Sequence, residues 1–209
     1  MSTVTEVRTF RGVARLSFDD AAPLKVRLKH FKAAPLAAGD DVDVEEYAQR
    51  LADMQRADAY EAALGSLDLC ARTRHELRRS LLSRGFMPSV VEDTLGRLAQ
   101  SGLIDDRRYA ERTVEVSAAR PVGVYAVRRK LRAKGIADED AEAALDALDD
   151  GQQAQAAGAA ARALLRKYAG LPAREGRAKL SQALARRGFS WEAVRTAVDA
   201  VWEADDWEE

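Results

Sequence analysis

The sequence predicts a mainly α-helical protein, an elongated tandem array of three-helix repeats with a small N-terminal β-hairpin extension. The first observation is a repeat: apolar residues recur at helical spacing around Gly85, Gly135 and Gly188, which lie 50 and 53 residues apart. The second is composition, because aromatic residues make up only 6% of the 209 residues, which favours thin helical layers. The third is strand-like alternation of apolar and polar residues within the first 45 positions.

The repeat is strict in its register. Counted from each glycine, positions −8, −4, +6, +10 and +13 are apolar in all three copies, and an apolar residue follows each glycine. Spacings of three and four residues place such side chains on one face of a helix. Each copy therefore predicts two amphipathic helices that meet at a glycine turn.

The N-terminal segment has a different pattern. Residues 13–18 and 24–28 alternate apolar with polar side chains, and turn-forming residues separate them, which predicts a β-hairpin. A two-stranded hairpin is marginally stable alone, so it must pack on another element or pair with residues 4–10 as a third strand. Apolar spacing across residues 44–69 then predicts one or two helices.

Local signals mark the helix ends of the first repeat. Thr73 and Glu76 form a capping-box pattern that starts a helix at about Arg74, and Gly85 ends it as a left-handed cap. A further helix is expected from Asp105. The domains predicted on this basis are an extension (1–45), a connecting helix (46–70), repeat 1 (71–120), repeat 2 (121–170) and repeat 3 with an acidic tail (171–209).

The formal net charge of −1 conceals segregated blocks. Residues 72–134 carry a net charge of +8 and residues 161–195 carry +7, whereas residues 135–160 carry −7, residues 196–209 carry −6 and residues 1–71 carry −3. Blocks of this kind create local positive potential on a surface that is neutral on average.

The tryptophans lie near the C-terminus. Trp191 and Trp202 are expected on the interior face of the last helix pair. Trp207 lies in the acidic tail, where we expect it to be exposed or to contact a partner.

Several classes of protein are excluded. No uncharged apolar run is long enough to span a membrane, and the N-terminus lacks the order of a signal peptide. The single cysteine, Cys70, excludes an internal disulfide and a cysteine metal cluster. We therefore expect a cytoplasmic monomer without a cofactor.

Three segments, residues 85–86, 102–110 and 128–136, together resemble the RecX family of bacterial recombination regulators. The order Leu-Ile-Asp-Asp-x-Arg-Tyr-Ala, followed by a basic repeat that ends in Lys-Gly-Ile, is the most specific part, and the resemblance spans about residues 60–202. It implies tandem three-helix repeats without catalytic activity. It also implies binding to the RecA recombinase filament, restraint of its ATPase and strand-exchange activities, and a role in homologous recombination, DNA repair and the SOS response.

Basic residues recur in register. An arginine doublet stands at equivalent places in two repeats, Arg78–Arg79 and Arg128–Arg129, and Ser181–Gln182 replaces it in the third. A curved array would present such charges as a stripe that binds the phosphates of single- or double-stranded DNA, or an acidic surface of the filament. The alternative is a solvated face that maintains solubility. The candidate binding residues are Arg74, Arg78, Arg79, Arg84, Arg128, Arg129, Arg132, Lys134, Arg186 and Arg187.

Three other function classes compete with a filament regulator. Helix-turn-helix-like pairs that read duplex sequence would make an autonomous DNA-binding protein. Asp105 and Asp106 invite a nuclease hypothesis, but adjacent helical residues do not share a face, and helix capping is the simpler role. The last alternative is a purely structural scaffold.

Overall fold

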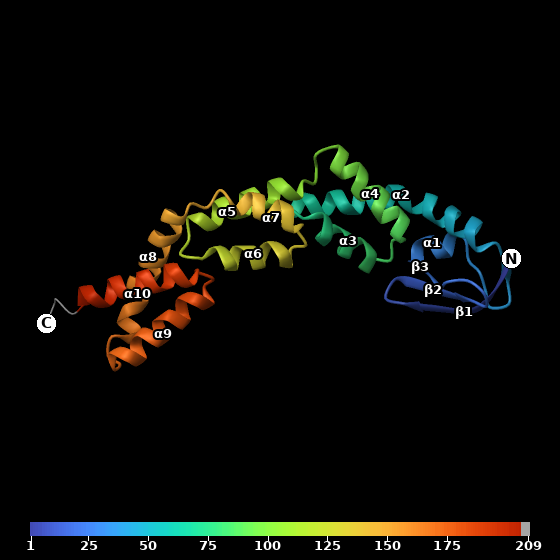
Figure 1. Cartoon of the computed structure of the whole chain (residues 1–209). Coiled ribbons are helices and arrows are strands. Elements are labelled where there is room, and N and C mark those ends of the chain that lie inside the picture. Colours follow the sequence, from blue (N-terminus) through green and yellow to red (C-terminus); the bar gives the residue numbers. More distant parts are fainter. Residues whose placement is uncertain (206–209) are drawn as a thin grey trace. The chain divides into compact units, whose positions relative to one another are not determined.

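The computed structural model of the protein describes residues 1–205 and confirms a mainly helical chain with a small N-terminal strand region (Figure 1). Trp207 and the rest of the acidic tail beyond residue 205 lie outside the described residues. The strands are β1 (Ser2–Phe10), β2 (Val13–Phe18), β3 (Leu24–Arg27) and β4 (Asp41–Val42). The helices are α1 (Leu28–Ala33), α2 (Val44–Leu69), α3 (Arg74–Ser83), α4 (Pro88–Gln100), α5 (Asp106–Ala118), α6 (Val124–Ala133), α7 (Asp138–Leu145), α8 (Asp150–Tyr168), α9 (Ala173–Arg186) and α10 (Trp191–Asp205).

The chain forms two compact units, Met1–Asp105 and Asp106–Glu209. The first contains an antiparallel sheet with strand order β3-β2-β1-β4, which confirms the hairpin and its third strand. Two short elements were not predicted, α1 and β4, and Leu28 begins α1 instead of ending β3. One face of the sheet is buried, and it joins a single core with α2, α3 and α4.

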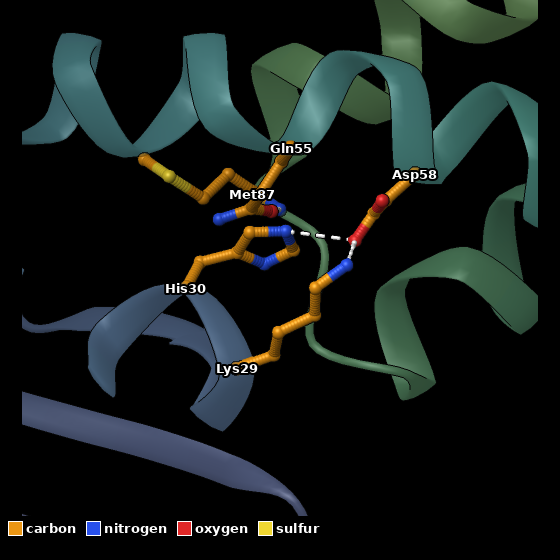
Figure 2. A network of polar contacts seen from close by, with 5 residues as sticks. All are labelled: Lys29, His30, Gln55, Asp58 and Met87. Carbon is orange, nitrogen blue, oxygen red and sulfur yellow. Dashed lines mark hydrogen bonds and ion pairs between the residues drawn. The ribbon is translucent and has the colours of Figure 1, made fainter. Parts of the chain in front are cut away.

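A polar network around the buried His30 attaches α1 to α2 (Figure 2). His30, which is only 4% exposed, donates from Nε2 to Oδ2 of Asp58 at 2.9 Å, and Nζ of Lys29 donates to the same oxygen at 2.7 Å. On the same face of α2, the Gln55 side chain accepts a hydrogen bond from the backbone N–H of Met87 at 3.0 Å. These contacts therefore join α2 to α1 and to the start of α4.

The predicted helix ends of the first repeat are confirmed. Thr73 and Glu76 form a complete capping box, and Pro88 opens α4 in its first turn. The repeat glycines Gly85, Gly135 and Gly188 have φ values of +85°, +74° and +84°, so each ends its helix in the left-handed conformation.

The grouping of helices into repeats differs from the division drawn at residues 70, 120 and 170. Residues of α5 are buried with α6 and α7, and residues of α8 are buried with α9 and α10. In the first unit, α2 packs with α3 and α4. The helix outside each glycine-anchored pair therefore precedes the pair, and the last repeat is complete. The linear pattern defines the pairs but does not determine which neighbouring helix covers them.

In the second unit, the glycine turn after α9 lies directly against the start of α6. The backbone N–H groups of Gly123 and Tyr125 donate to the carbonyl oxygens of Arg187 and Gly188, each at 3.0 Å. A Cβ added at Gly123 would lie 2.1 Å from the Gly188 carbonyl oxygen. The last two repeats therefore meet through backbone atoms, at a place where a side chain cannot fit.

The two described tryptophans have different environments. Trp202 is 6% exposed and belongs to the core of α8, α9 and α10, as predicted. Trp191 is 73% exposed, so its predicted interior position was wrong. It is the first residue of α10, where the side chain projects beyond the packed part of the helix. Among the described residues, none of the helices has the length and hydropathy to cross a membrane.

A pair of glycine substitutions tests the contact between the last two repeats. We expect Gly123→Ala to lower the free energy of unfolding by about 1–3 kcal/mol, because backbone atoms must move to admit the new Cβ. Gly65→Ala, in an exposed part of α2 with no atom near the new methyl group, is expected to raise it by about 0.5–1 kcal/mol. Urea unfolding followed by circular dichroism measures both, and equal effects would contradict the close approach.

The His30 network predicts a stability that falls in acid. Burial lowers the pKa of His30 below its ordinary value of 6.5, although Asp58 opposes the shift, so the unfolded chain binds the proton first. The free energy of unfolding should therefore decrease as the pH falls from 6.5 through the lowered pKa. Hydrogen bonding from Lys29 lowers the pKa of Asp58, whose contribution is lost at still lower pH.

Urea midpoints measured across this pH range test the prediction. We expect His30→Gln to flatten the pH dependence just below 6.5, and His75→Gln, at an exposed position of α3, to retain it. The same slope in both variants would assign the acid sensitivity to other groups.

Candidate functional site

The first arginine of each doublet binds a carboxylate within its own repeat. Nε of Arg78 lies 2.6 Å from Glu92, and the guanidinium of Arg128 holds both oxygens of Glu142 at 2.7 and 2.6 Å. The two pairs have the same sequence separation, 14 residues, and each joins the two helices on either side of the repeat glycine. These arginines therefore contribute to the packing of α3 on α4 and of α6 on α7.

Charge-assisted hydrogen bonds dominate the electrostatics of both pairs. The hydrogen bond from Arg78 lowers the pKa of Glu92, and partial burial opposes the shift. The hydrogen bond from Arg128 lowers the pKa of Glu142 in the same way. Both carboxylates stay ionised at neutral pH, and each neutralises the arginine that it binds.

The second arginine of each doublet has a different environment. Arg79 and Arg129 are exposed, and neither forms an ion pair within residues 1–205. Successive side chains on a helix point about 100° apart, so one arginine of a doublet faces the next helix while the other faces solvent. Of the two, only the second presents an unneutralised charge to solvent.

In the third repeat, both residues of this ion pair are replaced. Ser181 replaces the arginine, and Arg195 stands at the position equivalent to Glu92 and Glu142. A different ion pair, between Arg177 and Asp199 at 3.4 Å, joins α9 to α10. In this repeat a different ion pair therefore connects the two helices on either side of the glycine.

The remaining predicted residues make different kinds of contact. Arg74 shares Glu92 with Arg78, and Arg132 binds Asp138 at 2.9 Å. A terminal guanidinium nitrogen of Arg84 donates to the carbonyl oxygen of Ala62 at 3.4 Å. Lys134 and Arg187 are half-buried beside their glycines, and Arg186 is exposed.

One basic residue outside the predicted set lies beside Arg79 in the structure. Arg72 lines a hollow of about 300 Å³ together with Arg79, Glu76, Ser80 and Ser83. Its Nε atom is buried and has no hydrogen-bond partner in the described structure. Its position could have been inferred from the sequence, because Arg72 directly precedes the capping box at the start of α3.

The structure does not support a nuclease site at Asp105 and Asp106. No group of three histidine, cysteine, aspartate or glutamate side chains that could hold a metal ion occurs among the described residues. Asp105 and Asp106 lie where α5 begins, in agreement with the expected helix start.

Substitutions within one doublet separate the two roles. We expect Arg128→Ala to lower the thermal unfolding midpoint, because Glu142 loses its guanidinium partner, and Arg129→Ala to leave the midpoint unchanged. The pKa of Glu142 is depressed, so the stabilisation by the pair is present above its ordinary value of 4.5 and is lost as the pH falls through the depressed value. The difference between the variants should therefore vanish in acid. Equal midpoints at neutral pH would contradict this division.

The helical part of the chain matches models of known domains. The first three-helix domain of RecX matches residues 59–98, the second matches residues 105–145 and the third matches residues 151–198. These ranges agree with the observed packing, in which the additional helix precedes each glycine-anchored pair.

Individual proteins are similar over most of their length. Regulatory protein RecX of Halorhodospira halophila is 36% identical over 147 residues, which cover 70% of this chain and 89% of that protein. The protein of the same name from Chromohalobacter salexigens is 37% identical, over 63% of this chain and 84% of its own.

Solved structures are similar as well. A crystal structure of regulatory protein RecX has a TM-score of 0.67 at 26% identity and covers 95% of this chain and 100% of its own. That of RecX from Lactobacillus salivarius has a TM-score of 0.66 at 28% identity and covers 71% and 97%. The chain therefore belongs to the RecX family of regulatory proteins.

Proposed function

We propose that the protein binds the nucleoprotein filament of the RecA recombinase and inhibits its ATP hydrolysis and strand exchange, without catalysing a reaction itself. Membership of a family of regulatory proteins supports a regulatory role. The observation that carries the proposal is the recurrence of an exposed arginine, Arg79 and Arg129, at the same place in two repeats, with no ion pair among the described residues. Neither residue is needed for the helix packing described above.

Arg79 and Arg129 suit a partner that offers the same binding group at regular intervals. An unpaired guanidinium on a helix face binds phosphate or carboxylate groups in a bidentate manner. Each contact alone is weak, but two contacts made by one chain raise the affinity through effective concentration. A filament of identical subunits wound on DNA offers both groups at regular intervals. Occupation of neighbouring subunits would then hinder the movements that accompany ATP turnover.

The ion pairs favour this proposal over an autonomous sequence-reading protein. Direct readout needs several side chains of one helix that reach base edges in the major groove. In α3 and α6, Arg74, Arg78, Arg128 and Arg132 are held by carboxylates of the same repeat. One exposed, unpaired arginine in each doublet is enough for phosphate or carboxylate contact but poor for reading sequence. On this proposal the protein acts in the cytoplasm, as a monomer, and needs no cofactor.

The test is the DNA-dependent ATPase rate of the cognate RecA, titrated with this protein. We expect inhibition by the unaltered chain, and a need for about ten-fold or more protein when Arg79→Glu and Arg129→Glu are combined, because two attractive contacts become repulsive.

A matched double reversal controls for net charge. Arg50→Glu with Arg112→Glu changes two exposed arginines, one in each unit, and should inhibit like the unaltered chain. Thermal unfolding verifies that both double variants are folded. Absence of inhibition at saturating protein, or equal inhibition by both double variants, would reject the proposed role of these arginines.

A further inference from the structure

The exposed face of the N-terminal sheet carries three cations directly opposite one another. Arg8 on β1 pairs with Arg15 on β2, and Arg15 pairs with Lys25 on β3. All three are exposed, and neighbouring strands lie about 4.8 Å apart. Like charges in directly opposite positions destabilise a sheet, so the fold itself does not call for this row. Glu6 offsets part of the charge through its 2.6 Å ion pair with Arg8.

The next row on the same face presents an aromatic ring to solvent. Phe10 pairs with Val13, and Val13 pairs with Arg27. Alternation along β1 places Phe10 on the same face as Arg8. The Phe10 side chain is 71% exposed, although a buried core lies on the opposite face of the sheet. A large apolar ring is thus displayed beside the row of cations.

The β-turn adds a further cation at the ring. Arg11 and Gly12 form the two-residue connection between β1 and β2, with φ values of +48° and +79°. Asparagine or glycine is preferred at the first of these positions, because positive φ is unfavourable for other residues. Arginine stands there instead, and its guanidinium carbon lies 4.9 Å from the centroid of the Phe10 ring.

These residues surround a hollow that continues onto α3. Its volume is about 470 Å³, and its lining is Arg8, Phe10, Arg11, Val13, Arg15, Lys25 and Ser83. Ser83, in the last turn of α3, also lines the hollow of about 300 Å³ that contains Arg72 and Arg79. The two hollows are therefore neighbours within the first unit, and Figure 1 shows the β1–β2 hairpin beside α3.

We propose that this surface, which we call the hairpin face (the residues that line the larger hollow), binds single-stranded nucleic acid. Phosphates would contact Arg8, Arg15 and Lys25, and an unstacked base would lie on the ring of Phe10. Cations that follow a backbone beside an aromatic platform are the combination that binds single strands without sequence preference. Bases of a duplex are stacked and paired, so they cannot reach Phe10. The inference concerns the protein alone and does not rest on the proposed action on RecA.

The test is fluorescence anisotropy of a labelled oligothymidylate of about 15 nucleotides, measured with the full chain in the absence of RecA. We expect Arg15→Gln to weaken binding and to reduce the slope of log K against log salt by about 0.7, the value for one lost phosphate contact to a single strand. Phe10→Ala should weaken binding about five-fold or more without a change in slope, because it removes stacking and no charge.

Two controls keep the result specific. Arg50→Gln removes an exposed arginine from α2, outside both hollows, and should bind like the unaltered chain. Arg15→Gln relieves repulsion by Arg8 and Lys25, so its thermal midpoint should be no lower than that of the unaltered chain. Its loss of binding is therefore not a loss of fold.

The outcomes are distinct. The proposal is supported if oligothymidylate or oligouridylate binds more strongly than a duplex of equal length, and if both substitutions weaken that binding. The ratio of the affinities for oligothymidylate and oligouridylate would show whether DNA or RNA is preferred. Equal affinity for the duplex, with no effect of Phe10→Ala, would overturn it in favour of a non-specific polyanion surface. No binding to any of these nucleic acids would also overturn it and would leave an acidic protein as the occupant.

Discussion

The close approach of another element to a repeat glycine is the constraint on which the packing of the chain depends. At Gly85, a Cβ would lie 2.9 Å from the Val13 side chain and 3.3 Å from the backbone nitrogen of Arg27, so this turn lies against the N-terminal sheet. At Gly188, a Cβ would lie 2.2 Å from the backbone nitrogen of Ala126, so that turn lies against the second repeat. In the first unit, a glycine in the left-handed conformation thus lies where a helix pair meets the sheet. In the second unit, such a glycine lies where two helix pairs meet.

The two arginines of each doublet have different surroundings. A helix turns by about 100° at each residue, so two neighbouring arginines cannot have the same surroundings. Arg78 and Arg128 bind carboxylates across the glycine turn, and Arg79 and Arg129 remain in solvent. The ion pair orients the helix that carries the exposed arginine. Loss of the pair in the third repeat, where Ser181 and Arg195 occupy the two positions, changes both partners together.

Two basic surfaces of the first unit differ in chemistry. The exposed face of α3 presents Arg79, whereas the hairpin face combines several cations with Phe10. An isolated guanidinium on a helix suits phosphates or carboxylates, whereas an aromatic ring beside cations also accepts a stacked base. On the two proposals made above, a RecX protein of this kind would contact the filament through its helical repeats and a free single strand through its sheet.

The sequence by itself determined most of the elements and the helix ends of the first repeat. The apolar positions around three glycines predicted the helix pairs, and Thr73 with Glu76 predicted the start of α3. Alternation predicted the hairpin of β2 and β3, and β1 was expected only as one of two ways to stabilise it. The helix pairs, the helix start and the hairpin depend on residues close together in the chain. It also singled out the doublets. Only the tertiary structure decided that α5 belongs with α6 and α7, that one arginine of each doublet is neutralised, and that Arg8, Arg15 and Lys25 form a row. The helix grouping, the ion pairs and the row of cations each depend on which residues distant in sequence come into contact. Residue spacing does not contain that information, and neither does the net charge of a segment such as residues 1–71.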